Sequence, residues 1–304
     1  MTSDGGLILI RELDERLGLE KLIEEHLSDS RQAVNKQITL ADLLRQSVYR
    51  LAGYEYLNDA ERLAADPTFR WISSQKIWDR GAALTSTLHW FETELLTKEE
   101  NLIGLMALNR ETLGQADCLD SSDRVVLDMD SSEGPVHGEQ EGSAYNGHFE
   151  SVCYHPLFRF NSHGDCLAAK LRRGNVHSAG DWDELRLPEI ERQQAEGKEV
   201  AFRADAAFAK PEIYEALEEL GVKYAIRIPA DDSLERDIAD LLTRPVGRPS
   251  HKPVAWYKGF LYQAASWKMA RRAKGGVPPR GAVPASRLYR HEPEPAQSGG
   301  RAFL

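Results

Sequence analysis

The order of strand-like and helix-like segments between residues 125 and 229 constrains the fold more than any other feature of this sequence. Residues 125–130 are a short apolar run that contains two neighbouring valines and is followed by the turn-forming pair Ser131-Ser132. Short apolar runs bounded by turn residues predict buried strands. Two further strands are expected at residues 157–160 and 166–171, because turn-forming residues join them as in an antiparallel hairpin.

The remainder of this region alternates helices with strands. We expect a helix from Asp181 to about Glu196, a strand at residues 199–203, a helix at residues 212–220 and a strand at residues 223–228. The resulting order of elements is β-β-β-α-β-α-β. We interpret it as an α/β fold, a mixed sheet of the ribonuclease H (RNase H) kind with flanking helices, and residues 119–250 are its predicted extent.

A helical domain is expected before the sheet. Helical periodicity runs over residues 11–27, over residues 40–51 with Thr39 as a cap, and over residues 86–114. Glycines and an Asp-Pro pair separate the three stretches. We therefore predict a helical N-terminal domain over residues 1–118.

The C-terminal part of the sequence is basic and rich in helix and strand breakers. From Ser250 onward, ten basic residues face only two acidic ones, a net charge of +8, although the whole chain carries −10. The negative total argues against DNA binding by bulk attraction, so any DNA contact must use local cations. From Ala273 onward, glycine and proline leave no window with a regular period, so residues 273–304 are expected to be largely disordered.

Neither a targeting segment nor a membrane span is evident. Residues 1–10 lack a basic start, and no apolar stretch approaches the roughly 20 residues of a membrane helix. The three cysteines have no metal-finger spacing and fit a reducing compartment better than a disulfide frame. We therefore expect a soluble cytoplasmic protein.

Two aspartates end predicted core strands. Asp130 ends the first strand and Asp205 follows the fourth, 75 residues later. These strands are parallel neighbours in the predicted sheet, so the two carboxylates are expected to meet at one edge. Carboxylates held close repel each other unless a divalent cation lies between them, and oxygen ligands favour Mg²⁺ or Mn²⁺. Such ions activate water for phosphodiester cleavage.

Two alternatives to this metal site are open. Asp128 shares a strand face with Asp130, because strand side chains repeat every two residues, and it could be the ligand instead. We prefer Asp130 because it lies nearer the strand end. Asp130 and Asp205 could also simply cap the turns that follow them, a common role of aspartate. Two aspartates alone make a weak motif.

Several cationic side chains are candidates for contacts to DNA. Lys170, Arg172 and Arg173 follow a predicted strand, where they could reach a phosphate backbone at the metal site or form a solvated charge run. Lys252 and Lys258 lie in the basic C-terminal segment and are further candidates.

Aromatic and imidazole side chains give weaker signals. Trp256 and Trp267 lie in the basic segment and could stack on exposed bases, although tryptophans are more often partly buried. Five histidines gather in the predicted sheet domain, but none has the paired spacing of a metal site, so we interpret them as scattered loop and strand residues. These are His137, His148, His155, His163 and His177.

From residue 2 to about Arg272, the sequence resembles bacterial insertion-sequence transposases of the DDE type. The stretches that carry the resemblance are RELD (11–14), GYEYLNDA (53–60), LDMDSS (127–132) and RADAAF (203–208). The resemblance implies that Asp130 is the first metal ligand and Asp205 the second. It also implies that residues 251–272 begin a β insertion and that the helical domain binds the DNA ends.

The third ligand of such enzymes is a glutamate in a late helix, in the pattern Tyr, two residues, Arg, three residues, Glu, six residues, Lys. This sequence lacks that pattern: Glu292 and Glu294 have the wrong spacing, and neighbouring prolines do not fit inside a helix. The tail after Arg272 has the Gly, Pro, Ala and Arg composition of a GC-rich gene read out of frame. We therefore hypothesise a frameshifted, C-terminally truncated copy.

Three candidate functions follow. The first is a metal-dependent DNA transposase that cleaves insertion-sequence ends and joins them to target DNA, with activity lost in this copy for lack of the third acidic residue. Its expected partner is double-stranded DNA with terminal inverted repeats, engaged by a homodimer. The alternatives are a non-catalytic DNA-binding remnant of a transposase and a metal-dependent nuclease.

Overall fold

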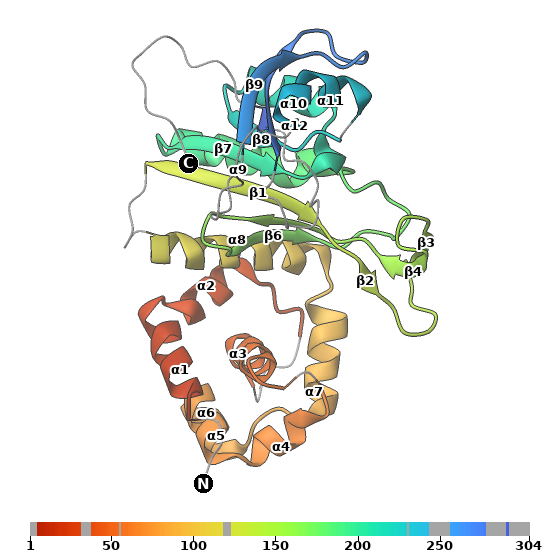
Figure 1. Cartoon of the computed structure of the whole chain (residues 1–304). Coiled ribbons are helices and arrows are strands. Elements are labelled where there is room, and N and C mark those ends of the chain that lie inside the picture. Colours follow the sequence, from red (N-terminus) through yellow and green to blue (C-terminus); the bar gives the residue numbers. More distant parts are fainter. Residues whose placement is uncertain are drawn as a thin grey trace, which may run out of the picture. The chain divides into compact units, whose positions relative to one another are not determined.

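The computed structural model describes residues 5–31, 38–54, 56–117, 123–229, 231–242, 256–277 and 290–291. The chain divides into two compact units, Met1–Ser121 and Ser122–Leu304, and Figure 1 shows the elements of each. The architecture is mixed α/β, with a helical N-terminal unit followed by a unit built on a mixed sheet, as predicted. No helix in the described ranges is both long enough and apolar enough to cross a membrane.

The regular elements described in the first unit are all helices. Its elements are α1 (Leu7–Arg16), α2 (Leu19–His26), α3 (Leu40–Leu51), α4 (Asp59–Ala65), α5 (Pro67–Ser73), α6 (Gln75–Arg80), α7 (Thr85–Trp90), the π-helical segment η1 (Phe91–Leu95) and α8 (Glu99–Asp117). Figure 1 shows α3 end-on, with the other helices of the unit around it. Ten of the 12 residues of α3 are buried, so this helix forms the centre of the unit's core.

The observed helix ends confirm one predicted helical stretch and correct another. The hydroxyl of Thr39 accepts the main-chain N–H of Asp42 at 3.0 Å, which confirms the predicted start of α3. The single helix expected at residues 11–27 is wrong, because Gly18 adopts a φ of 62° and separates α1 from α2. Glycine takes this left-handed conformation without the steric penalty that other residues meet.

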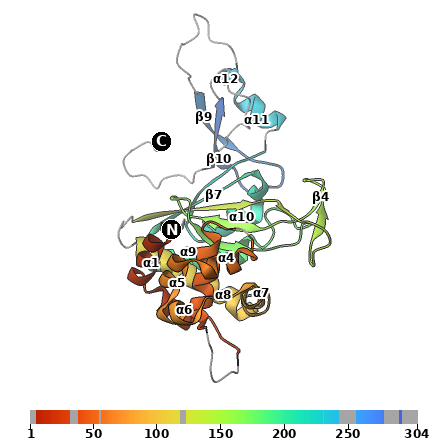
Figure 2. The ribbon, with the colours of Figure 1, turned by 90° about the horizontal axis from the view of Figure 1, so that it is seen from below.

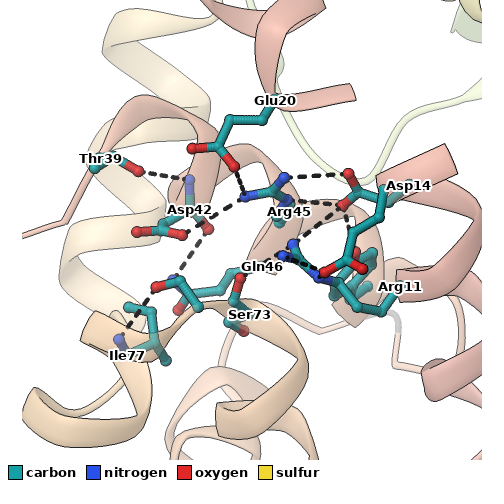
Figure 3. A network of polar contacts seen from close by, with 12 residues as sticks. Arg11, Asp14, Glu20, Thr39, Asp42, Arg45, Gln46, Ser73 and Ile77 are labelled. Atoms are coloured by element: carbon teal, nitrogen blue, oxygen red, sulfur yellow. Dashed lines mark hydrogen bonds and ion pairs between the residues drawn. The ribbon is translucent and has the colours of Figure 1, made fainter. Parts of the chain in front are cut away.

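A buried ion-pair network ties α1 to α3 (Figure 3). Asp14 and Arg45 are 4% and 3% exposed, and two hydrogen bonds of 2.7 and 3.1 Å join their side chains. Tyr49, also buried, donates its hydroxyl to the same carboxylate at 2.6 Å. Glu20 lies 3.1 Å from Arg45, and Arg11 lies 3.6 Å from Asp14. A buried charge without a partner is strongly unfavourable, so these side chains depend on one another.

The second unit is built on a five-stranded sheet with the order β6-β5-β1-β7-β8. Its strands are β1 (Arg124–Ser131), β5 (Leu157–Phe160), β6 (Cys166–Lys170), β7 (Glu199–Ala204) and β8 (Lys223–Ile226). β5 is antiparallel to β1 and β6, whereas β7 is parallel to β1 and β8. Helices α9 (Trp182–Ala195) and α10 (Pro211–Glu219) precede β7 and β8. Leaving aside inserted strands described below, this is the predicted order of elements.

One face of this sheet is buried. Leu127, Phe202 and Tyr224 point to it from β1, β7 and β8 and are at most 2% exposed. Tyr214 of α10 stacks on Tyr224 with ring centroids 5.4 Å apart. Because side chains alternate along a strand, the register that buries Leu127 and Met129 turns the even-numbered residues of β1 to the other face. That face carries both aspartates of this strand.

Two smaller sheets extend the unit. β2 (Gly134–Pro135), β3 (Ala144–Asn146) and β4 (Ser151–Tyr154) form one, with β4 in the middle, in a region where no strand was predicted. β9 (Trp256–Tyr262), β10 (Arg271–Val277) and β11 (Arg290–His291) form the other. Figure 2 shows β9 and β10 near α11 (Asp232–Asp237) and α12 (Ala239–Leu242), and α12 contacts both strands.

Strand β10 corrects the prediction that regular structure ends at Ala273. Residues 273–277 pair with β9 in continuous register, and Ala273 also pairs with His291 of β11. The glycine-rich composition of this segment predicted disorder. Main-chain hydrogen bonds nevertheless pair it with β9, and such pairing does not require apolar and polar side chains to alternate. A Cβ at Gly276 would lie 2.7 Å from the ring of Tyr257, so a larger residue there would have to displace this exposed ring. The rest of the predicted tail lies outside the described residues.

Candidate metal centre

The parallel pairing of β1 with β7 brings Asp130 and Asp205 to one edge of the sheet. Met129 pairs with Ala204, and the two aspartates are the next residues along their chains. Adjacent strands lie about 4.7–4.9 Å apart, so the two side chains start from neighbouring positions. Both line one cavity of about 650 Å³. The two carboxylates predicted to meet are therefore brought together.

Each aspartate also makes a local main-chain hydrogen bond. Asp130 accepts the N–H of Ser131 at 2.8 Å, and Asp205 accepts the N–H of Ala207 at 3.0 Å. Asp205 thereby caps the short 3-10 helix η2 (Ala206–Phe208), as the capping alternative expects. A carboxylate offers about four lone-pair sites, and both aspartates are exposed, so capping leaves oxygen positions for a cation. Capping and metal binding are compatible here.

The electrostatics of the edge disfavour two bare carboxylates. Burial raises the pKa of Asp130, and the charges of Asp205 and Asp128 raise it further, whereas the hydrogen bond from Ser131 opposes the shift. A divalent cation beside these groups would lower the pKa of the carboxyl groups, because its positive charge favours their ionised form. Two carboxylates at an open edge fit Mg²⁺ or Mn²⁺, with the remaining ligand positions left to water and phosphate oxygens.

We expect Asp130→Asn to stabilise the metal-free chain slightly at pH 8. A carboxyl whose pKa is raised by folding stabilises the fold only while it is protonated, and that contribution is lost as the pH rises through the raised pKa. Solvent screening at this exposed position limits the gain to at most about 1 kcal/mol, a rise in melting temperature of about 2–4 °C.

Calorimetry of the two proteins across pH 4 to 8 measures this effect. The gain should shrink as the pH falls and should disappear when Mn²⁺ is added, because the cation removes the repulsion. Asp128→Asn, which breaks an ion pair, is the matched control and should give no gain. A lower melting temperature for Asp130→Asn at pH 8 without metal would contradict the expected repulsion.

Asp128, the alternative first ligand, is engaged by an arginine. Nε and Nη2 of Arg203 donate to the two carboxylate oxygens in a bidentate ion pair. The two residues face each other directly in the register of β1 and β7. Bidentate arginine pairs are geometrically specific and strong, so Asp128 is the less available metal ligand. Asp130 remains as the strand-end neighbour of Asp205.

Two cavity-lining arginines were not identified as site residues from the sequence. Arg203 lines the cavity while it holds Asp128, and Arg227 lines it from the end of β8. The main-chain N–H of Arg227 donates to Ala204 at 3.2 Å, which places Arg227 alongside the chain that leads into Asp205. The sequence could have indicated Arg227, because it directly follows β8, and β8 is parallel to β7, the strand that Asp205 follows. Guanidinium groups suit phosphate recognition.

Arg172 is not available to DNA, which corrects one predicted contact. Its side chain is 5% exposed and donates to the main-chain carbonyl groups of several neighbours. These are His155 at 2.9 Å, His177 at 3.3 Å, Gly180 at 2.5 Å and Ser178 at 3.1 Å. The sequence pattern could not distinguish such a buried arginine from a surface cation. Arg173, the next residue, is exposed.

The predicted lysine contacts lie in other settings. Lys170 lies 2.6 Å from Glu184 and 3.4 Å from Asp181, so its charge is largely compensated. Lys258, on β9, lies 2.9 Å from Asp240. Lys252 lies outside the described residues. Of the two described lysines, neither Lys170 nor Lys258 lines the cavity that holds the two aspartates.

No third ligand joins Asp130 and Asp205 within the described ranges. One group of three in those ranges has histidine, cysteine or carboxylate ligand atoms within 4.8 Å of one another, and it comprises Glu25, His26 and Glu111 of the helical unit. Glu292 and Glu294, the nearest sequence candidates for the missing glutamate, are not described. In the described part of the chain, the edge therefore offers Asp130 and Asp205, besides Asp128, which is paired with Arg203.

The two tryptophans of the basic segment have different environments. Trp267 is 6% exposed and packs edge-on against Tyr214 and Tyr262, so the prediction that it could stack on bases is wrong. Trp256 is 50% exposed on β9 and keeps that possibility. The burial of Trp267 depends partly on Tyr214 of α10, a distant segment that the local sequence does not reveal.

Comparison with known proteins identifies the family. A family model described as transposase DDE domain group 1 matches residues 1–280, which extends past Arg272, where the sequence resemblance was expected to stop. A search of curated proteins found no match. The matched span includes β1 and β7, the two strands that bring Asp130 and Asp205 together. The chain therefore belongs to the family of transposases with a DDE domain.

Proposed function

We propose that Asp130 and Asp205 hold Mg²⁺, or Mn²⁺ in its place, for DNA strand cleavage and strand transfer at insertion-sequence ends. The observation that carries this proposal is the meeting of two exposed carboxylates at the ends of parallel strands β1 and β7. The raised pKa of Asp130 supports it, because such a pair is unfavourable unless a cation binds. Family membership supplies DNA as the class of substrate.

The side chains around the two carboxylates suit this chemistry. A bound divalent ion would lower the pKa of a coordinated water and stabilise the leaving oxygen of a phosphodiester. Arg203 neutralises Asp128, which removes a third negative charge from the path of the DNA. Arg227 lines the cavity and is the guanidinium best suited to bind a phosphate group there.

The proposed partner is double-stranded DNA that ends in terminal inverted repeats. In this proposal the helical unit holds the DNA ends, two copies act as a homodimer on a pair of ends, and the reaction takes place in the cytoplasm. Local cations must carry the contact, since the net charge of the chain is −10. Among the described residues, the exposed Arg173 and the cavity-lining Arg227 have the right sign, and the sequence from Ser250 onward carries a net charge of +8.

We propose further that the chain does not complete strand cleavage by itself. The sequence lacks the Tyr-Arg-Glu-Lys pattern of a third ligand, and no third ligand joins the aspartates in the described ranges. Without a third carboxylate, the second ion loses a ligand, and in-line attack depends on the placement of that ion. If a frameshift removed the pattern, another reading frame of the gene should restore it.

A DNA assay tests both proposals. We expect the purified chain to bind a duplex that carries the inverted repeats flanking its own gene, with Kd rising steeply with salt. With Mg²⁺ or Mn²⁺, we expect no detectable strand cleavage. Cleavage that Asp205→Ala abolishes would show that the chain is catalytically complete, and absence of any binding to the repeats would contradict the proposed partner.

The second candidate is a non-catalytic DNA-binding remnant, and the missing third ligand favours it. Binding without cleavage in the same assay supports this candidate together with the incomplete site. A metal-dependent nuclease is the third candidate, because the same edge could cut DNA without joining it. A strand-transfer assay with a labelled, pre-cut end separates joining from cutting.

A further inference from the structure

The cavity of the metal centre holds charged side chains at two levels. Asp130, Asp205 and Arg227 each come one residue after paired positions of the parallel strands β1, β7 and β8, so they share the first level. Asp128 and Arg203 face each other two residues earlier, on β1 and β7. Side chains two residues apart on a strand point to the same face. All five residues line the cavity, so both levels open into it.

The spacing of the two levels suits a nucleic-acid backbone. Two strand residues at about 3.3–3.4 Å each separate the levels by roughly 6.7 Å. Successive phosphate groups of one nucleic-acid strand lie a similar distance apart. A DNA strand that follows β1 and β7, with one phosphate at the first level, therefore brings the next phosphate to the second. The cavity continues in this direction, because residues 161–164 of the β5–β6 turn line it beyond Phe160, which pairs with Asp128.

The guanidinium of Arg203 keeps donors for a second partner. Its Nε and Nη2 donate to the carboxylate of Asp128, so the ion pair holds one edge of the planar group. A guanidinium carries five N–H donors, and Nη1 makes no hydrogen bond to the described residues. The side chain is 53% exposed, so a phosphate group can reach the remaining donors from solvent. Asp128 thus holds Arg203 without exhausting its capacity to bind an anion.

A purely structural role accounts poorly for this ion pair. Arg271 makes a similar bidentate contact with Glu218, but it is buried and packs over the ring of Tyr214. That pair joins β10 to α10 inside the unit. Exposed ion pairs contribute little to stability, and the Asp128–Arg203 pair lies on the open face of the sheet. Its position beside the metal centre favours a role in binding.

We propose that Arg203 binds the phosphate group next to the one held at Asp130 and Asp205, so that one DNA strand runs along β1 and β7 towards the β5–β6 turn. This inference rests on the proposed function, because it requires a phosphate at the metal centre. Arg203 donates through Nη1 to a non-bridging oxygen while its Nε and Nη2 stay with Asp128. Arg227, at the first level, serves the phosphate at the metal centre.

The test removes the ion pair as a unit, by combining Arg203→Gln with Asp128→Asn in the full chain. Arg203→Gln alone would leave the charge of Asp128 without its partner, which would repel phosphate even if Arg203 made no contact with it. The double variant keeps the net charge, because one positive and one negative charge are removed together. A weaker contact with phosphate in this variant therefore reports the lost guanidinium.

The probes are two small nucleotides that differ by one phosphate group. Thymidine 5′-monophosphate carries one phosphate, whereas the two phosphates of thymidine 3′,5′-bisphosphate have the spacing of successive phosphates in DNA. Binding is followed in the presence of Mn²⁺ by the broadening of the ³¹P resonances. Probes of this size contact the metal centre without involving the helical unit.

We expect the wild-type chain to bind the bisphosphate about tenfold more tightly than the monophosphate, as for one added hydrogen bond between charged groups. In the double variant this advantage should fall below about twofold. An undiminished advantage there would overturn the proposal. The matched control combines Glu199→Gln with Lys223→Gln, which removes an exposed ion pair of 2.6 Å outside the cavity. This control should keep the full advantage of the bisphosphate.

A second variant, Arg203→Lys, tests the contact without removing the charge. Lysine can neutralise Asp128, but it lacks the planar fork that holds a carboxylate on one edge and a phosphate on the other. The advantage of the bisphosphate should therefore fall below about threefold. An advantage as large as in the wild-type chain would overturn the contact through Nη1.

Failure of the proposed function gives a different result from failure of this inference. If the monophosphate shows no Mn²⁺-dependent binding that Asp205→Ala removes, the metal centre itself is wrong. If that binding is present but the bisphosphate has no advantage in the wild-type chain, only the role of Arg203 is wrong.

Discussion

Replacing Asp205 with alanine is expected to reduce Mn²⁺ affinity by at least about 100-fold, because loss of an outer-shell partner alone typically costs 10–100-fold. Asp205 and Asp130 line the same cavity from neighbouring strand ends, so removal of either leaves a single carboxylate. Isothermal titration or the electron paramagnetic resonance of free Mn²⁺ measures the loss. Asp130→Ala should behave in the same way.

Asp128→Ala is the matched control for this prediction. It removes a carboxylate from the same face of β1, but one that is already paired with Arg203, so Mn²⁺ affinity should change less than about threefold. A large loss with Asp128→Ala and a small one with Asp130→Ala would reverse the assignment of the first ligand. Equal affinity of all variants and wild type would show that Mn²⁺ binds elsewhere.

Replacing Asp14 with alanine is expected to destabilise the helical unit by about 3 kcal/mol, near the lower end of values for a broken buried ion pair. The change leaves Arg45, which is 3% exposed, without its main partner. Burial alone would lower the pKa of Arg45, but the hydrogen bond and charge of Asp14, with those of Glu20, raise it. Glu20 stays 3.1 Å away, which keeps the loss below the upper end of the range.

Hydrogen exchange of the full chain measures this second effect where it occurs. Amides of α1 and α3 should exchange about 100-fold faster in Asp14→Ala, whereas those of β1 and β7 should be unaffected. Tyr49→Phe removes only the 2.6 Å hydrogen bond to Asp14 and should cost about 1 kcal/mol. The double variant Asp14→Leu with Arg45→Met should recover much of the stability, since apolar replacements of buried pairs are often tolerated. Unchanged exchange in Asp14→Ala would contradict the role assigned to the network.

The sheet, and the edge at which Asp130 and Asp205 meet, could be predicted because they follow from local patterns and a topological rule. Alternating or continuous apolar runs marked β1 and β7, and the helix between strands required a parallel crossover. Once the two strands were neighbours, Asp130 and Asp205 had to share an edge. Chain separation does not weaken this inference, because strand direction alone fixes which ends meet.

Other features escaped prediction because they depend on tertiary partners. The sequence pattern around Arg172 predicts a surface cation. In the structure the side chain is buried, and its guanidinium donates hydrogen bonds to main-chain carbonyl groups. Trp267 is buried in part by Tyr214, which is distant in sequence.

The parallel pairing of β1 with β7 also has a consequence for when Asp130 and Asp205 come together during synthesis. β1, β5 and β6 are joined by antiparallel pairing of near neighbours, whereas β7 can add to β1 only after α9 has crossed the sheet. A nascent chain that has not passed residue 205 lacks one of the two carboxylates that are proposed to hold the cation. Ribosome-bound intermediates should therefore begin to retain Mn²⁺ only once β7 has emerged. The chain length at which Mn²⁺ is first retained would then report when β7 pairs with β1.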